Sequence, residues 1–209
     1  QSTVALSGEA ADEIFGGYRQ FHDPQIQRAD AFPWVAIGAP WSDASGYILT
    51  PALRAALDLE TYVQDRYVDA IAEVERLAAE DDFTHRMRVM SYLHLTRHVG
   101  VLLDRKDRLS MASGLEVRVP FCDHRLVEYV YNTPWSMKSY DGREKSLLRG
   151  AVADVLPESV VQRVKSPYPS TSDPKYSAAI LDQARELLVS GSDRLFSVVD
   201  RNAVSYTHL

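Results

Sequence analysis

The stretch from Val4 to Tyr18 constrains this chain more than any other part of its sequence. A short apolar run, Val4 to Leu6, leads into a Ser-Gly pair, and acidic residues follow before Gly16-Gly17. The apolar run predicts a buried strand, and the two glycines predict the end of a helix that starts behind the turn. A strand that runs into a helix N-terminus points free backbone N–H groups at the turn, which favours anions such as phosphate.

Three carboxylates occupy this predicted helix. Glu9, Asp12 and Glu13 have the spacing i, i+3 and i+4, which places them on one helical face. Acidic residues in a first turn complement the helix dipole. Three on one face repel each other, however, unless a cation or a basic group lies among them. With the Ser-Gly turn, the pattern indicates a phosphate site with a divalent metal, which takes oxygen ligands. Acidic surface turns are common, so both interpretations stand at this point.

Two later segments join the first in a recognisable order. One runs from Leu103 to Arg125 and contains Arg-Lys-Asp-Arg-Leu-Ser-Met-Ala followed by Glu-Val-Arg-Val-Pro-Phe; the other, from Gly142 to Pro169, contains Gly-Arg-Glu-Lys-Ser and Lys-Ser-Pro-Tyr-Pro. With the Ser-Gly-Glu-x-x-Asp-Glu-x-Phe-Gly-Gly-Tyr string at the start, they resemble the asparagine synthase family, in its ATP-dependent synthetase domain. The resemblance covers residues 3 to about 174.

The resemblance implies an α/β fold. The chain would be the C-terminal part of a doubly wound parallel-sheet domain of the ATP-pyrophosphatase type, mostly α-helical in this segment. We expect residues 1–203 to form a partial, N-terminally truncated synthetase domain and interpret 204–209 as a non-native tail. The family's Ser-Gly-Gly-x-Asp-Ser loop and its cysteine-led glutaminase domain do not occur in the sequence, and both are expected upstream.

The family's reaction is the adenylation of a side chain. ATP and the β-carboxylate of aspartate give β-aspartyl-AMP and pyrophosphate, and ammonia derived from glutamine then displaces AMP to give asparagine. A carboxylate is a poor electrophile, and adenylation supplies it with a good leaving group. ATP and Mg²⁺ are the implied cofactors. The alternatives are an amide-forming adenylating enzyme like the β-lactam synthetases or lasso-peptide cyclases, and a catalytically inert helical remnant.

The resemblance also assigns site residues. Ser7 and Gly8 would lie against the nucleotide. Glu9 would be catalytic, positioning the incoming ammonia or accepting its proton. Asp12 would hold magnesium on the pyrophosphate side, and Lys145 would be catalytic by neutralising charge that develops on the phosphates.

Several neighbours of these residues carry weaker expectations. Lys145 and Arg149 would lie one turn apart on a predicted helix, as a like-charge pair that an anion would relieve. Arg118 and Asp123 are expected to form a buried ion pair. Ala10 replaces the glycine usual in the family and would strain the turn if that position needs the freedom of glycine.

The remaining basic residues and the histidines leave alternatives open. Lys106, with its basic neighbours, belongs either to a solvated helix face or to a phosphate site. Lys165, near a proline turn, could reach phosphate or be structural. His94 and His98 are i, i+4 but lack a nearby third ligand, so no metal site is predicted there.

Composition narrows the class of protein. The 209 residues are 45% hydrophobic, enough for one sizeable domain, and the formal net charge of -6 argues against nucleic acid as a partner. The single cysteine, Cys122, excludes an internal disulfide and fits a reducing compartment, so we expect a cytoplasmic protein. We interpret that cysteine as a small buried apolar side chain. No apolar run reaches membrane-spanning length. The family resemblance is also compatible with a homodimer.

The apolar spacing predicts five helices, at 61–77, 85–103, 126–131, 143–156 and 176–189. Met87 and Met90 are expected to fill the core. Asp123 should cap the helix at 126–131. Residues 23–60, with four prolines, are predicted to be irregular, and 166–174 to be an ordered loop. Val117 to Pro120 is the only other predicted strand.

Overall fold

The computed structural model describes residues 2–38, 48–166, 173–191 and 193–208. The chain divides into two compact units, each with its own architecture. The first contains Gln1–Ala36 and Val68–Lys165, and the second contains Ile37–Tyr67 and Ser166–Leu209. All residues assigned to the site from sequence belong to the first unit.

The sheet of the first unit is small and parallel. Strand β1 (Val4–Leu6) pairs with β2 (Glu116–Arg118), with Val4 opposite Glu116. Both predicted strands are therefore present, and the unit is α/β with mostly helical content. The expectation that β1 is buried is wrong in part, because Leu6 is 75% exposed and β2 is its only partner strand among the described residues.

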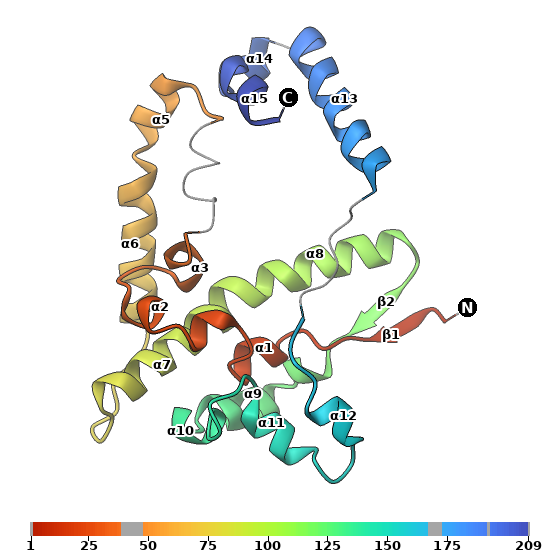
Figure 1. Ribbon diagram of the computed structural model, residues 1–209. Helices are drawn as coiled ribbons and strands as arrows, with labels where there is room; N and C mark the ends of the chain where they lie inside the picture. The colour runs from red at the N-terminus through yellow and green to blue at the C-terminus, as the bar shows by residue number, and fades with distance from the viewer. Residues whose placement is uncertain (1, 39–47, 167–172, 192, 209) are drawn as a thin grey trace. The chain divides into compact units, whose positions relative to one another are not determined.

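A long helical segment carries β2 to its place beside β1 (Figure 1). Helix α7 (Asp82–Leu93) continues through the π-helical turn η2 (His94–His98) into α8 (Val99–Ala112). The segment begins at Asp81, whose carboxylate accepts a hydrogen bond from Thr84 N at 2.7 Å. The predicted helix at 85–103 lies inside this segment. The observed helix continues to Ala112, so part of the second motif is helical.

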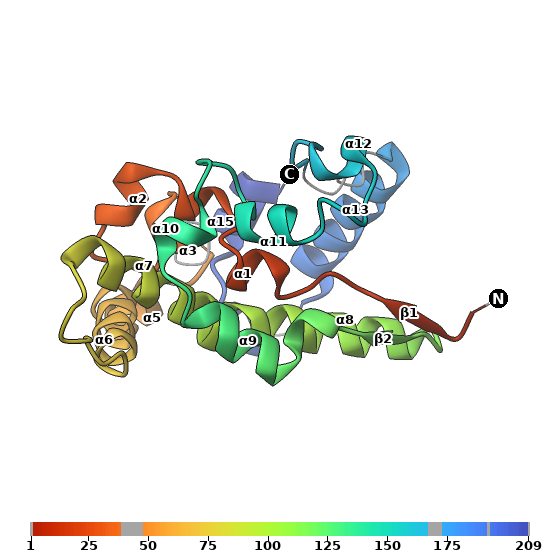
Figure 2. The ribbon, with the colours of Figure 1, turned by 90° about the horizontal axis from the view of Figure 1, so that it is seen from below.

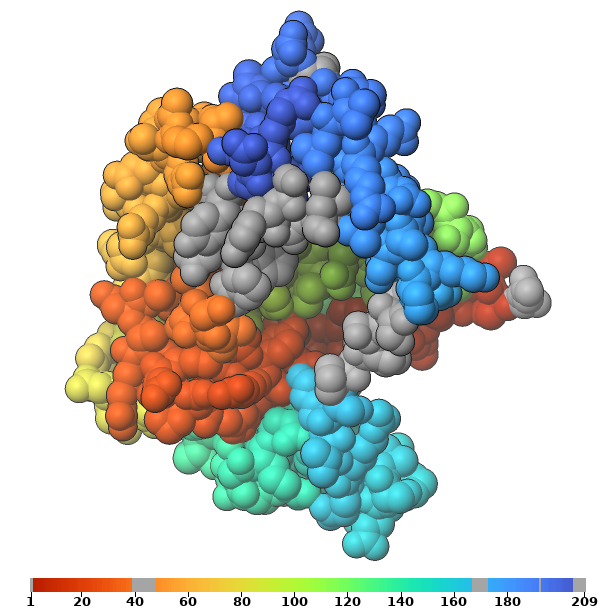
Figure 3. Space-filling model, turned by 45° about the horizontal axis from the view of Figure 1, so that its top comes forward, coloured from red at the N-terminus to blue at the C-terminus, as the bar shows by residue number. Residues whose placement is uncertain are grey.

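The core of the first unit consists of two clusters. The first groups Phe21, Ile26, Met87 and Met90, so the two methionines fill the core as predicted. The second joins α1 (Ala11–Ile14) to a later helix through Ile14, Phe15 and Val130. Figures 2 and 3 show the red N-terminal segment beside the teal segment that follows β2.

Prolines 24, 33 and 51 begin helices, which overturns the prediction that 23–60 is irregular. The short helices are η1 (Arg19–Phe21), α2 (Pro24–Arg28) and α3 (Pro33–Ala36) in the first unit and α5 (Pro51–Leu57) in the second. Proline is tolerated in a first turn, because its missing N–H would have no helical partner there. Pro40 lies outside the described residues.

The segment after β2 contains short helices. They are η3 (Pro120–Cys122), α9 (His124–Tyr131), α10 (Trp135–Lys138), α11 (Ser146–Ala151) and α12 (Glu158–Val161). The predicted Asp123 cap is confirmed, because its side chain accepts from Arg125 N at 2.9 Å. The predicted Arg118–Asp123 ion pair is wrong. Arg118 pairs with Glu116 at 2.8 Å and Asp123 with Arg125 at 2.7 Å, each a partner two residues away in the sequence.

The second unit is helical, with one antiparallel bridge between Leu49 and Val199. Its helices include α5, α13 (Pro174–Ser190), α14 (Asp193–Phe196) and α15 (Arg201–His208), while α6 (Leu59–Ala72) begins in it and ends in the first unit. The predicted helix at 176–189 is confirmed, and the one at 61–77 ends earlier, at Ala72. Most of the predicted loop at 166–174 lies outside the described residues.

Helix α15 continues to His208, although no helix was predicted beyond residue 203; the boundary there stays a prediction. Among the described residues, no helix combines the length and the apolarity needed to cross a bilayer.

Candidate active site

The turn after β1 is built by the backbone. Ser7 N donates to Arg118 O at 2.9 Å, which extends the sheet ladder by one bond, and Ala11 N donates to Gly8 O at 3.2 Å. Between them Ala10 has φ 70 and is 1% exposed, so it occupies the left-handed region that favours glycine. The strain predicted for Ala10 is thus present. Helix α1 starts after this residue, so Glu9 lies in the turn before it. The prediction that Glu9 and Asp12 share one helical face is therefore wrong.

Glu9 is held by a lysine from α8. The Nζ atom of Lys106 forms an ion pair with the Glu9 carboxylate and donates to Ser7 Oγ at 2.8 Å, and Ser7 Oγ donates to Glu9. Burial raises the pKa of Glu9, but the bonds from Lys106 and Ser7 outweigh it, and the pKa is lowered from 4.5. Glu9 is therefore an ionised carboxylate at neutral pH.

Asp12 is held by two lysines. The Nζ atoms of Lys165 and Lys145 lie 2.7 Å and 3.2 Å from its Oδ1. Burial raises the pKa of Asp12, but the two ammonium groups prevail and lower it from 3.8. Lys165 also donates to Gly17 O at 2.8 Å and lies 4.7 Å from the centroid of the Tyr18 ring. The last motif thus returns to the first one, 153 residues away in sequence.

Glu13 differs from the other two carboxylates. Its side chain is buried and accepts a hydrogen bond from Tyr18 Oη at 2.7 Å. Burial raises the pKa of Glu13 above 4.5 despite this bond. It also raises the pKa of Tyr18, which keeps the phenol protonated as the donor. Glu13 therefore ties α1 to the turn at Tyr18 from within the core.

Two glycines allow close packing at the end of α1. Gly16 has φ +65 and ends α1, as predicted, and an added Cβ there would lie 2.6 Å from the Trp135 ring. A Cβ at Gly17 would lie 1.8 Å from Asp12 Oδ1 and 2.8 Å from Asp12 Cα. At Gly8, by contrast, an added Cβ meets no atom within 4 Å. The space beside Gly8 is therefore open on the protein side.

Lys145 reaches Asp12 from a residue outside any helix. It has φ 57 and precedes α11, so the predicted helix from 143 to 156 is wrong at both ends. The predicted like-charge pair with Arg149 is wrong as well. Arg149 donates to Glu144 Oε1 at 2.6 Å and to Arg163 O at 3.0 Å. Its guanidinium group therefore bonds to residues on either side of α11 and α12 and is not directed at a ligand.

Three lysines and three carboxylates meet in this group of residues. The ammonium groups of Lys106, Lys145 and Lys165 face the two ionised carboxylates of Glu9 and Asp12, and the buried Glu13 lies within electrostatic range of Asp12 and Lys165. The described residues contain no group of three or more His, Cys, Asp or Glu that could hold a metal. Asp12 can contribute one oxygen ligand, which suits Mg²⁺, since this ion commonly takes one or two carboxylates and completes its shell with phosphates and water.

The structure brings Ser7, Glu9, Asp12 and Lys145 together and adds Lys106 and Lys165. Sequence reasoning left both of these lysines undecided between a structural and a phosphate role. Each lies inside a motif, but spacing alone gave no sign that they converge on the first motif. Cys122, expected to be buried, is half-buried, and burial and nearby carboxylates raise the pKa of its thiol, as suits an inert side chain.

The first unit is thus an α/β unit with a strand–turn–helix at its first motif, around which lysines from three later segments gather. The chain belongs to the asparagine synthase family, whose family model matches residues 1–207. It is 41% identical over 198 residues to "Asparagine synthetase [glutamine-hydrolyzing] 3" of Bacillus subtilis, covering 95% of this chain and 31% of that protein.

Two further relatives show how broad the similarity is. "Asparagine synthetase [glutamine-hydrolyzing] 1" of Bacillus subtilis is 29% identical over 80% of this chain and 30% of its own length. "Amidase chyE" of Penicillium rubens is 24% identical over 79% of this chain and 32% of its own length. The chain thus spans about a third of the length of these relatives.

Proposed function

We propose that the chain forms part of an ATP-dependent, glutamine-hydrolysing asparagine synthase, a carbon–nitrogen ligase. It would convert aspartate, ATP and ammonia into asparagine, AMP and pyrophosphate through β-aspartyl-AMP. The observation that carries this proposal is the Asp12 carboxylate held between Lys145 and Lys165, with the ionised Glu9 in the adjoining turn.

The two lysines on Asp12 would act on the phosphates. A triphosphate offers several anionic oxygens, and the three lysines of the site attract them. When Lys145 and Lys165 move from Asp12 to phosphate oxygens, they neutralise charge that develops as pyrophosphate leaves. Asp12 is then free as a ligand for Mg²⁺, which when bound neutralises phosphate charge as a Lewis acid. Ser7 and the open backbone at Gly8 would lie against the nucleotide.

Glu9 would position the nitrogen nucleophile. Its lowered pKa makes it a weak base, so it is poorly matched to removing a proton from ammonia at neutral pH. As a fixed carboxylate it can accept a hydrogen bond from ammonia and stabilise the positive charge that forms on nitrogen during attack. Between the two family roles, positioning and proton acceptance, the structure therefore favours positioning.

The rest of the enzyme is proposed from family membership. A glutaminase domain and the Ser-Gly-Gly-x-Asp-Ser loop would precede this segment, with glutamine as the ammonia source. A cytoplasmic location and a homodimer complete the proposal; cell fractionation and analytical ultracentrifugation of the full-length enzyme test them.

The test uses the full-length enzyme with Glu9→Ala or Lys145→Ala. We expect asparagine formation to fall by about 100-fold or more, because each change removes a charge that acts on the reacting groups, while glutamine hydrolysis persists. Glu60→Ala and Lys175→Ala, at exposed positions on α6 and α13, are the matched controls. Synthesis at the control rate in either test variant would refute the assigned role.

One rival is amide formation in which the same machinery activates a carboxylate other than that of aspartate. Pyrophosphate release from ATP should depend on aspartate and not on a panel of other amino acids and β-amino acids. A preference for a β-amino acid would favour the β-lactam synthetase type. Absence of any carboxylate-dependent release from the full-length protein would favour the inert remnant.

A further inference from the structure

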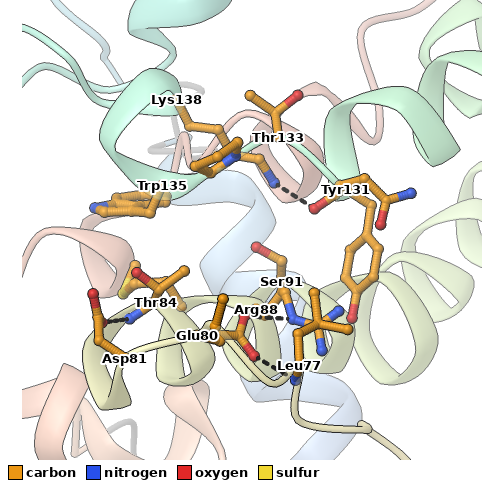
Figure 4. A pocket seen from close by; sticks show the side chains of 14 residues that line it. Leu77, Glu80, Asp81, Thr84, Arg88, Ser91, Tyr131, Thr133, Trp135 and Lys138 are labelled. Atoms are coloured by element: carbon orange, nitrogen blue, oxygen red, sulfur yellow. Dashed lines mark hydrogen bonds and ion pairs between the residues drawn. The ribbon is translucent and has the colours of Figure 1, made fainter.

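A pocket lies in the first unit, away from the carboxylate and lysine residues of the candidate site. It has a volume of about 220 Å³ and lies between α7, the end of α9 and α10 (Figure 4). None of its lining residues belongs to the group formed by Ser7, Glu9, Asp12 and their lysines. Whatever it binds is therefore held by separate chemistry.

A buried lysine is the chemically unusual feature of this pocket. Lys138 on α10 is 3% exposed, and its Nζ donates one long hydrogen bond, 3.4 Å, to Tyr131 O. Across the part of the chain that the structure describes, no carboxylate lies within ion-pair distance of this Nζ. An ammonium group has three donors, and a buried charge is ordinarily paired. Burial lowers the pKa of Lys138 to about 8, so the group still carries its charge at neutral pH.

Two carboxylates line the pocket, and both are already engaged. Asp81 accepts a hydrogen bond from Thr84 N at 2.7 Å. Glu80 lies across the pocket, with Oε1 2.7 Å from Arg88 Nε and Oε2 3.1 Å from His85 Nδ1. Arg88 is in turn engaged by Glu80 and by the carbonyl of Glu75. Glu80 and Arg88 therefore balance each other, and among the described residues Lys138 is left with the Tyr131 ring, whose centroid lies 6.0 Å from its Nζ, and with no carboxylate partner.

The rest of the wall combines apolar surface with hydroxyl groups. Trp135 and Met87 contribute apolar side chains, and Ser91, which is 2% exposed, and Thr84 contribute hydroxyls. Figure 4 shows Lys138 and Trp135 on one side of the space, with Ser91, Arg88 and Glu80 on the other. A ligand here would meet a cation at one end and apolar surface along its body.

We propose that this pocket binds a small organic carboxylate with an apolar body, whose carboxylate pairs with Lys138 and whose body lies against Trp135. One ammonium group matches one carboxylate, whereas a phosphate is ordinarily held by several donors or a free arginine. The volume suits such a ligand, since a cavity of about 150 Å³ is enough for benzene. Phenylacetate has the required charge, shape and size.

The proposal is tested by titrating the purified 209-residue chain with phenylacetate, with its neutral isostere phenylacetamide, and with inorganic phosphate. Binding is followed by calorimetry and by the indole N–H signal of Trp135, identified with Trp135→Phe. We expect phenylacetate to shift this signal and to bind at least about tenfold more tightly than phenylacetamide, because a charge-assisted bond is lost in the amide. Phosphate should leave the signal in place.

Lys138→Met keeps the length of the side chain and removes its charge. It should reduce phenylacetate affinity by about tenfold or more and abolish the preference over phenylacetamide. Lys145→Met, the matched change in the candidate active site, should alter neither. Equal binding of acid and amide by the unmodified chain would overturn the proposal, as would unchanged affinity in a folded Lys138→Met. The first comparison needs no variant, so it decides the matter even if Lys138→Met does not fold.

Discussion

The close contact between Gly17 and Asp12 gives the sharpest test of how this site is built. Replacing Gly17 with alanine would place the new Cβ 1.8 Å from Asp12 Oδ1 and 2.8 Å from Asp12 Cα. A side-chain oxygen can rotate away, but the backbone atom can move only if α1 shifts. Overpacking of this kind typically costs about 1–3 kcal/mol. The displaced carboxylate would also lose its place between Lys145 and Lys165.

Gly8→Ala is the matched control, because the same methyl group would meet no atom within 4 Å and the backbone there is not left-handed. Its effect on stability should stay within about 0.5 kcal/mol. For a chain of this length, a loss of about 2 kcal/mol in Gly17→Ala lowers the melting temperature by roughly 4–8 °C. In urea it lowers the midpoint by about 1 M.

Melting curves of the two variants and the parent, followed by tryptophan fluorescence, measure the difference. If Gly8 lies against the nucleotide, Gly8→Ala should keep its stability and still lose ATP affinity, which separates the folding role of one glycine from the binding role of the other. Equal melting temperatures for both variants would refute the packing argument.

Two further predictions concern charges that the structure buries or ties down. Because the pKa of Glu13 is raised in the folded state, the unfolded chain binds fewer protons above about pH 4.5. Glu13 therefore lowers the free energy of unfolding progressively as pH rises. The stability of Glu13→Gln relative to the parent should increase between pH 4.5 and pH 7. Urea midpoints of variant and parent that differ by the same amount at pH 4.5 and at pH 7 would contradict this. Arg149→Met should cost about 2–4 kcal/mol, since it leaves Glu144 and the carbonyls of Val161 and Arg163 without their donor. The exposed Lys175→Met is the control and should lose less than about 0.5 kcal/mol. If the melting temperature of Arg149→Met is also unchanged, these bonds add little to stability.

Local pattern was sufficient for much of the fold. The strands at β1 and β2, the helices at α9 and α13, the stop at Gly16 and the buried methionines all follow from periodicity and cap chemistry. Two of the errors, at the starts of α1 and α11, occur where one backbone angle decides the outcome. Ala10 and Lys145 adopt left-handed φ values of 70 and 57, which delay the start of α1 and α11, and both residues are ordinary helix formers by propensity.

The sequence by itself determined the family, the strand–turn–helix at the first motif, and the identity of the carboxylates and lysines from which a charged site could be made. Only the tertiary structure decided which lysine meets which carboxylate, because Lys106, Lys145 and Lys165 are brought to Glu9 and Asp12 by three separate segments. It also separated Arg149 from the ligand side and left Lys138 buried without a counter-ion. Pairing of this kind depends on contacts between residues distant in the sequence, whereas periodicity reports only which side of an element faces the core.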